Sequence, residues 1–103
     1  MNLYTVIMGF SDHRQGVGQY EAESPLQALK TFIENSESLH GFDRQKLLNG
    51  ISSDPFIHLK HFKGIWVARF VPAVISEIAD SNGDKVLGAH VLQSDPNGPE
   101  REG

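Results

Sequence analysis

The chain has 103 residues, of which 39% are hydrophobic and 21% are charged, and its formal net charge is −4. This length and composition predict one globular domain and argue against wholesale disorder. The absence of cysteine excludes disulfides, thiol catalysis and thiolate metal sites, and the mild acidity gives no support to non-specific DNA binding.

Residues 1–10, MNLYTVIMGF, lack the basic segment and the small-residue cleavage site of a signal peptide. No stretch of the sequence reaches the roughly 18 apolar residues that a membrane span requires. We therefore expect a cytoplasmic protein that has no membrane contact.

Residues 3–10 are dense in β-forming residues. Leu3 and Ile7 lie on one face of the expected strand, and Tyr4, Val6, Met8 and Phe10 lie on the other. A strand that is apolar on both faces belongs inside a sheet. After the turn residues SDHRQG, residues 17–23 are expected to pair back as a second strand.

Residues 24–39 carry the clearest helix signal. Ser24 suits the N-cap, Pro25 the first helical position, and Gln27 completes a Ser-x-x-Gln capping box. Apolar residues follow at helical spacing. A shorter helix is predicted over residues 42–51, with Asp43 as its cap and Asn49-Gly50 at its end.

From Phe56 onward the pattern favours strands. Residues 52–55, SSDP, are expected to break the chain, and strands are predicted at 56–62, 65–71, 73–79 and 85–92. Lys63-Gly64 provides a turn, and Pro72 indicates a bend or an edge position.

The stretch DSNGDK, residues 80–85, resembles the start of a calcium-binding loop. Asp80, Asn82 and Asp84 occupy the first three ligand positions. Lys85 and Val91, however, stand where such a loop needs Gly and Glu. The sequence therefore favours a turn over an ion site.

Asn82-Gly83 predicts a two-residue type I′ turn, with a longer bulged loop as the variant. A two-residue turn joins strands 73–79 and 85–92 into a hairpin. It places Asp80 opposite Lys85, and Val74 opposite Val91.

The predicted order is ββααββββ, which implies an α+β fold: a mostly antiparallel sheet of four to six strands with two helices packed on one face. Residues 1–94 are expected to form this single domain. Residues 95–103, which have no apolar anchor, are expected to form a mobile C-terminal tail.

No catalytic set, cofactor motif or metal-ligand pattern is visible in the sequence. No serine stands in a Gly-x-Ser-x-Gly elbow, and no His-Glu-x-x-His occurs. His58 and His61 are three residues apart, so on a strand their side chains point to opposite faces. We therefore predict no catalytic residue, cofactor or metal ion.

One stretch stands apart in charge. Residues 55–76 contain three Lys or Arg residues and two histidines but no Asp or Glu, and Phe62, Trp66 and Phe70 are interleaved with them. The candidate binding surface predicted there consists of His58, Lys60, His61, Lys63, Trp66 and Arg69. Basic residues alternating with aromatic ones are also typical of surfaces that stack bases and follow a phosphate backbone.

The stretch QYEAESPLQALKTF resembles a strand-to-helix unit of HicB-like antitoxins and of some small phage anti-defence proteins. The shared pattern is an aromatic strand end, a Ser or Thr cap, and Ala-Leu in the helix. It covers about 20 of the 103 residues. The Gly-Cys element expected before the helix in HicB-like chains is absent, so no functional residue is carried over. The resemblance implies a bacterial or phage origin.

These observations predict a small non-catalytic binding module whose partner is a protein. The uncovered sheet face and the basic stretch 55–76 are its candidate surfaces. Two alternatives stay open: nucleic-acid binding through residues 55–76, and a small-ligand binder or enzyme whose site no motif reveals. A homodimer is a third arrangement to test, because a sheet covered on one face leaves apolar surface to hide.

Overall fold

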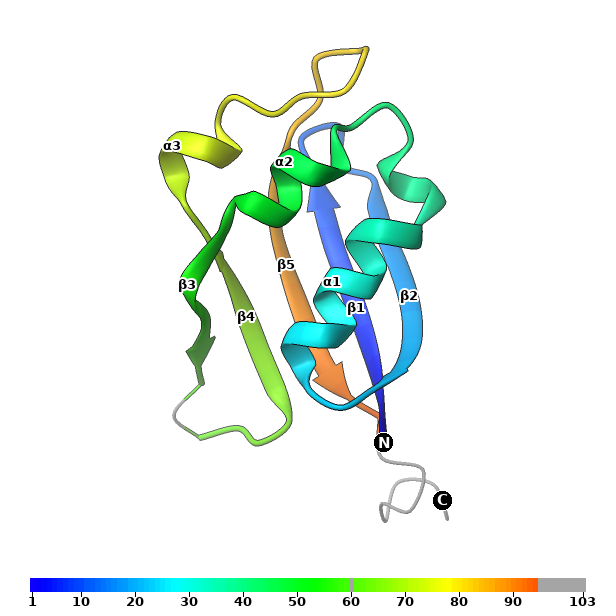
Figure 1. Cartoon of the computed structure of the whole chain (residues 1–103), viewed down its shortest axis with the longest axis vertical. Coiled ribbons are helices and arrows are strands. Elements are labelled where there is room, and N and C mark those ends of the chain that lie inside the picture. Colours follow the sequence, from blue (N-terminus) through cyan, green and yellow to red (C-terminus); the bar gives the residue numbers. More distant parts are fainter. Residues whose placement is uncertain (60, 95–103) are drawn as a thin grey trace.

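The computed structural model describes residues 1–59 and 61–94. Lys60 and the predicted tail, residues 95–103, lie outside the described residues. The elements, shown in Figure 1, are β1 (Asn2–Phe10), β2 (Gln15–Ala22), α1 (Pro25–Asn35), the 3₁₀ helix η1 (Glu37–Leu39), α2 (Arg44–Asn49), β3 (Ile51–His58), β4 (Ile65–Phe70), α3 (Pro72–Ile75) and β5 (Val86–Gln93).

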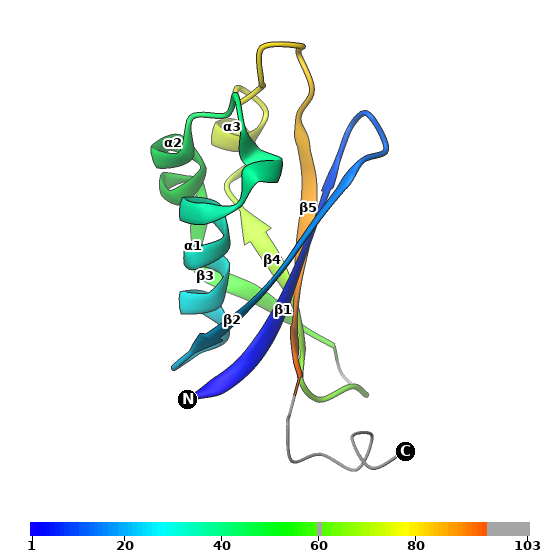
Figure 2. The same ribbon diagram turned by 90° about the vertical axis from the view of Figure 1, so that its right-hand side faces the viewer.

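The strands form one antiparallel sheet of five strands in the order β2-β1-β5-β4-β3. Figure 2 shows the helices on one side of this sheet. The predicted α+β class, with a mostly antiparallel sheet and helices on one face, is confirmed.

Strand β1 lies inside the sheet, between β2 and β5, as its two apolar faces predicted. Its even-numbered residues from Tyr4 to Phe10 are buried beneath the helices, whereas Leu3 and Ile7 on the other face are only partly buried. The core therefore lies between the sheet and α1, whose Leu29, Phe32 and Ile33 are fully buried.

The two predicted helix caps are present. The Ser24 side chain accepts a hydrogen bond from the Gln27 N–H at 3.1 Å, and the Gln27 side chain accepts one from the Glu23 N–H at 2.8 Å. At α2 the Asp43 carboxylate accepts one from the Lys46 N–H at 3.1 Å. Local side-chain chemistry thus fixes where both helices begin.

The predicted strand at 73–79 is wrong, because residues 72–75 form the short helix α3. Pro72 has no N–H to give to a sheet ladder, and its fixed φ suits the first helical position. The apolar residues of this segment still contribute to the core. Ile78 is buried, and Val74 and Ile75 pack against the core from outside the sheet.

The predicted hairpin between 73–79 and 85–92 is therefore wrong as well. Strand β5 pairs instead with β1 and β4, so that Val91 lies opposite Val6 and Trp66 rather than Val74. Both partners are distant in sequence, and a turn signal gives no information about such pairing.

Residues 80–84 do form a tight turn, but of the bulged variety. The Gly83 N–H donates to the Asp80 oxygen and the Asp80 N–H donates to the Asp84 oxygen, both at 3.0 Å. Gly83 alone in this turn has positive φ (+84°), whereas a type I′ turn also requires it at Asn82. The Asp80 carboxylate accepts the N–H groups of Asn82 and Asp84, each at 2.9 Å.

The β1–β2 connection repeats this geometry. The His13 N–H donates to the Phe10 oxygen and the Phe10 N–H donates to the Arg14 oxygen, again at 3.0 Å. His13 takes the place of Gly83, with φ +68°. The two turns are joined through Ser11, whose N–H donates to the Lys85 oxygen at 2.9 Å and whose Oγ accepts the Lys85 N–H at 2.8 Å.

The predicted break at residues 52–55 is also corrected, since this segment belongs to β3. The ladder to β4 is irregular there: Ile51 pairs with Phe70, and regular pairing resumes only at Phe56. A bulged edge strand tolerates Pro55, which explains why residues typical of a break lie within a strand. Gly64 turns the chain toward β4 with φ +75°, as predicted.

Candidate functional site

The most distinctive surface is the side of the sheet that faces away from the helices, here called the open face. Among the residues that the structure describes, no helix lies on this side (Figure 2). Its large aliphatic side chains lie outside the core cluster and its packing shell. They are Leu3, Ile7, Val17, Ile57, Ile65, Val67 and Leu92.

One row of the open face crosses all five strands. Ile7 lies opposite Val17 on one side and His90 on the other, and Val67 lies opposite both His90 and Ile57. Directly opposed Cβ atoms are about 5 Å apart, so the row extends roughly 20 Å across the sheet. We call Val17, Ile7, His90, Val67 and Ile57 the central row.

The central row contains four aliphatic side chains and one histidine, and none of its members is an Asp, Glu, Lys or Arg. Within the row, the aliphatic side chains at the two ends are the most exposed, with Val17 at 61% and Ile57 at 47%. His90, in the middle strand, is also exposed. Two aliphatic pairs on either side of His90 are more than the single exposed apolar residues that soluble proteins ordinarily carry.

Polar groups lie beside the central row toward the two edges of the sheet, while Leu92 and Ile65 extend the apolar surface between them. In the next row, Thr5 lies between Gln19 and Leu92, and its Oγ1 accepts a hydrogen bond from Gln19 Nε2 at 3.0 Å. Glu21 lies beyond them on β2. On β4, Arg69 forms an exposed ion pair with Asp54, with 3.3 Å between Nη1 and Oδ2. An apolar centre with a polar rim is the usual anatomy of a protein interface.

The structure separates the residues of the predicted surface at 55–76. Trp66 points toward the helix-covered side, where its ring centroid lies 5.9 Å from that of Tyr4 and 6.5 Å from that of Phe56. Arg69 points to the open face. Side-chain alternation along β4 therefore places the aromatic and the basic group on opposite sides of the sheet.

The remaining predicted residues belong to the end of β3 and the loop that follows. His61 and Lys63 are exposed beside Phe62, whose exposed fraction is 64%. The backbone of His58 pairs with Trp66, and Lys60 lies outside the described residues. Phe62 is thus the aromatic residue of this stretch that faces solvent, whereas Trp66 and Phe70 pack against the core. The binding role of this surface stays a prediction.

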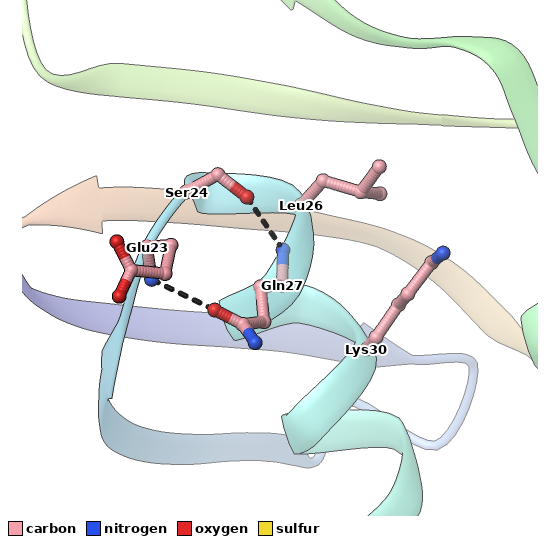
Figure 3. A pocket seen from close by; sticks show the side chains of 5 residues that line it. All are labelled: Glu23, Ser24, Leu26, Gln27 and Lys30. Atoms are coloured by element: carbon pink, nitrogen blue, oxygen red, sulfur yellow. Dashed lines mark hydrogen bonds between the residues drawn. The ribbon is translucent and has the colours of Figure 1, made fainter. Parts of the chain in front are cut away.

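A surface hollow of about 410 Å³ lies beside the beginning of α1, lined by Glu23, Ser24, Leu26, Gln27 and Lys30. Figure 3 shows that its polar groups are those of the helix cap, joined by the two capping hydrogen bonds. The hollow is therefore accounted for by the way in which the helix begins.

Residues 1–59 and 61–94 contain no group of three or more His, Asp or Glu side chains placed to hold a metal ion. Nor does any helix in these two segments have the length and apolarity to cross a bilayer.

Burial raises the pKa of Tyr20, which packs edge-on against Phe32 under the helices.

Sequence reasoning found only part of the open face. It assigned Leu3 and Ile7 to one side of β1 and anticipated an uncovered face. It did not find the central row, because that row depends on β5 lying between β1 and β4. The sequence does show apolar residues at positions 57, 65 and 67, which alternate along their strands. Only the strand order shows that Ile57 and Val67 lie in one row with Val17.

Comparisons with protein-family models, curated proteins and solved structures found no match to this chain.

Proposed function

We propose that this protein is a non-catalytic binding module that docks onto a partner protein through the open face of its sheet. The central row is the observation that carries the proposal. It places Val17, Ile7, Val67 and Ile57 in one line across five strands, outside the hydrophobic core. Burying such a row gains about 25 cal/mol for each Å² of apolar surface removed from water.

The character of this surface defines the partner. The central row offers no charge and, apart from His90, no side-chain hydrogen-bonding group. A nucleic acid would bring phosphates to this apolar centre, and the chain's net charge of −4 would repel them. The complementary surface is therefore an apolar patch on a protein, with polar groups placed to meet Glu21 and the Arg69–Asp54 pair at the rim.

Affinity capture from the native host, followed by binding measurements with the isolated partner, tests the proposal. Val67→Glu places a charge in the middle of the central row and is expected to weaken binding by at least about tenfold, since burying an unpaired charge is costly. Lys30→Glu, a charge change on the exposed surface of α1, is the matched control and should leave the affinity unchanged.

Both variants are first checked for wild-type thermal unfolding, so that a loss of binding reports on the surface and not on the fold. Equal affinity for wild type and Val67→Glu would refute the proposal. A captured partner that is lost with Lys30→Glu but kept with Val67→Glu would move the site to the helix side.

A further inference from the structure

Strand β2 has one free edge. It pairs with β1 alone, through an unbroken antiparallel ladder that runs from Asn2–Ala22 to Gly9–Gln15. Figure 2 views the molecule from this side and shows β2 in front of β1, with α1 and η1 beside it in the helix layer. A free edge exposes a row of backbone N–H and C=O groups that can accept another strand.

The two edges of the sheet differ in their protection. Strand β3, at the other edge, contains Pro55 and a register shift between Ile51 and Phe56, and both features discourage strand addition. Strand β2, QGVGQYEA, has no proline, lysine or arginine, and no shift interrupts its ladder. The β3 edge is thus protected against strand addition, whereas the β2 edge is a regular strand of eight residues.

Alternation of the ladder identifies the free groups. Phe10 and Arg14 close the hairpin as a hydrogen-bonded pair, since the Phe10 N–H donates to the Arg14 oxygen. Hydrogen-bonded and non-hydrogen-bonded pairs alternate from there, so the even-numbered residues of β2 bond to β1. The odd-numbered residues point their N–H and C=O groups outward. They are Gln15, Val17, Gln19 and Glu21.

Within the described chain, no turn, loop or helix group makes a backbone hydrogen bond to these four residues. We infer that β2 pairs antiparallel with β2 of a second copy of this protein. The two sheets then form one sheet of ten strands around a two-fold axis perpendicular to it. The helices of both copies lie on the same side, and the two open faces become continuous.

The strand itself indicates the register. With Gly18 on the two-fold axis, Gln15 pairs with Glu21 of the second copy and Val17 pairs with Gln19. This register pairs all four outward-pointing residues with one another. If the two-fold axis lay at Val17 or at Gln19 instead of Gly18, one of the four would have no outward-pointing partner in β2. Gly18 then meets its own copy in a non-hydrogen-bonded pair, where Cα atoms approach to about 4.5 Å and the lack of a side chain avoids crowding.

Charge does not oppose this pairing, and exposure favours it. Glu21 is the only charged residue of β2 and lies opposite Gln15 of the second copy, so no like charges face each other. Arg14 stays engaged within its own chain, with Asp12, Asp80 and the Phe10 ring. Val17, 61% exposed at the end of the central row, gains a neighbouring strand.

Sedimentation equilibrium over a range of concentrations tests the inference. The weight-average mass of the wild-type protein in solution should rise with concentration from 11.4 kDa toward twice that value. Gln19→Pro removes an outward N–H and leaves the ladder to β1 intact, so it should weaken the dimer by at least about tenfold. Gln19→Thr removes the same side chain but keeps the N–H, and it should dimerise like the wild type.

Amide hydrogen exchange gives a readout that needs no variant. The amides of Gln15, Val17, Gln19 and Glu21 should become protected as concentration rises, while Gly16 and Gly18, already bonded to β1, should not change. A wild-type protein that is monomeric at every concentration would overturn the inference, as would a dimer that Gln19→Pro leaves intact. Val67→Glu should still dimerise, which separates this interface from the docking of a partner on the open face.

Discussion

His13 occupies a backbone conformation that the equivalent turn gives to a glycine. Its φ of +68° is matched by Gly83 in the turn at residues 80–84. The left-handed region costs a residue with a Cβ about 1–2 kcal/mol, and replacing it by glycine removes this cost. Glycine also has more conformational freedom in the unfolded state, which offsets part of the stabilisation. His13→Gly should therefore raise the free energy of unfolding by about 1 kcal/mol, as measured by urea denaturation.

Asp12→Gly is the control for this change. Asp12 has no positive φ, and its carboxylate accepts the Arg14 N–H at 3.1 Å. Removing that side chain should lower the stability of the same turn. If both glycine variants shift the unfolding curve in the same direction, the conformational explanation for His13 fails.

Gly16 is required for a different reason, namely close packing. A Cβ at this position would lie 2.7 Å from Ser38 Cβ and 3.2 Å from Phe32 Cζ. Gly16→Ala should cost about 1–3 kcal/mol, because the neighbouring β-carbon is fixed by its backbone and cannot rotate away. Thermal unfolding measures the loss.

Gly9→Ala is the matched substitution, since a Cβ there would have no neighbour within 4 Å. It should leave the melting temperature close to that of the wild type. Equal losses from both alanines would show that backbone freedom, and not the contact with Ser38, makes Gly16 necessary.

At the scale of elements, the start of α1 depends on two side chains. Ser24 caps the Gln27 N–H, and Gln27 in turn caps the Glu23 N–H. Ser24→Ala should lower the free energy of unfolding by about 1 kcal/mol, because it leaves a helix-terminal donor without its partner. Ser24→Asn retains an acceptor and should recover most of the stability in the same denaturation experiment. If Asn is no better than Ala, the hydrogen bond is not the cause.

Elements whose boundaries depend on local chemistry were predictable, and those that depend on distant partners were not. Ser24, Pro25 and Asp43 mark helix starts within a few residues, so α1 and α2 were found. Residues 73–79 alternate like a strand, but strand identity requires a neighbour to pair with. Strand β5 finds its neighbours in β1 and β4, and α3 packs outside the sheet.

At the scale of the whole molecule, the candidate site follows from strand order. The stretch 55–76 is continuous in sequence, yet the sheet turns Trp66 inward and Arg69 outward. The central row is dispersed in sequence, with members from Ile7 to His90, and the antiparallel order brings them into line. The existence of an uncovered face could be predicted from the sequence, but its composition could not.

The two faces of the sheet should differ in how much stability they lose from the same chemical change. Val6 is fully buried under the helices, whereas Val67 lies on the open face outside the core. Threonine has nearly the shape of valine and also favours strands, so the substitution mainly adds a hydroxyl. Val6→Thr should cost about 1–3 kcal/mol, because that hydroxyl loses water without a guaranteed partner. Val67→Thr should change stability by less than about 0.5 kcal/mol, since its hydroxyl stays hydrated.

Urea unfolding of dilute protein measures both changes, and dilution keeps any self-association out of the comparison. A large loss from Val67→Thr would mean that the open face is covered within a single chain, which would leave the proposed docking surface without support. A small loss there, beside a large one from Val6→Thr, would show that the aliphatic residues of the open face contribute little to folding. Their exposure to water would then be a cost that binding to a partner relieves.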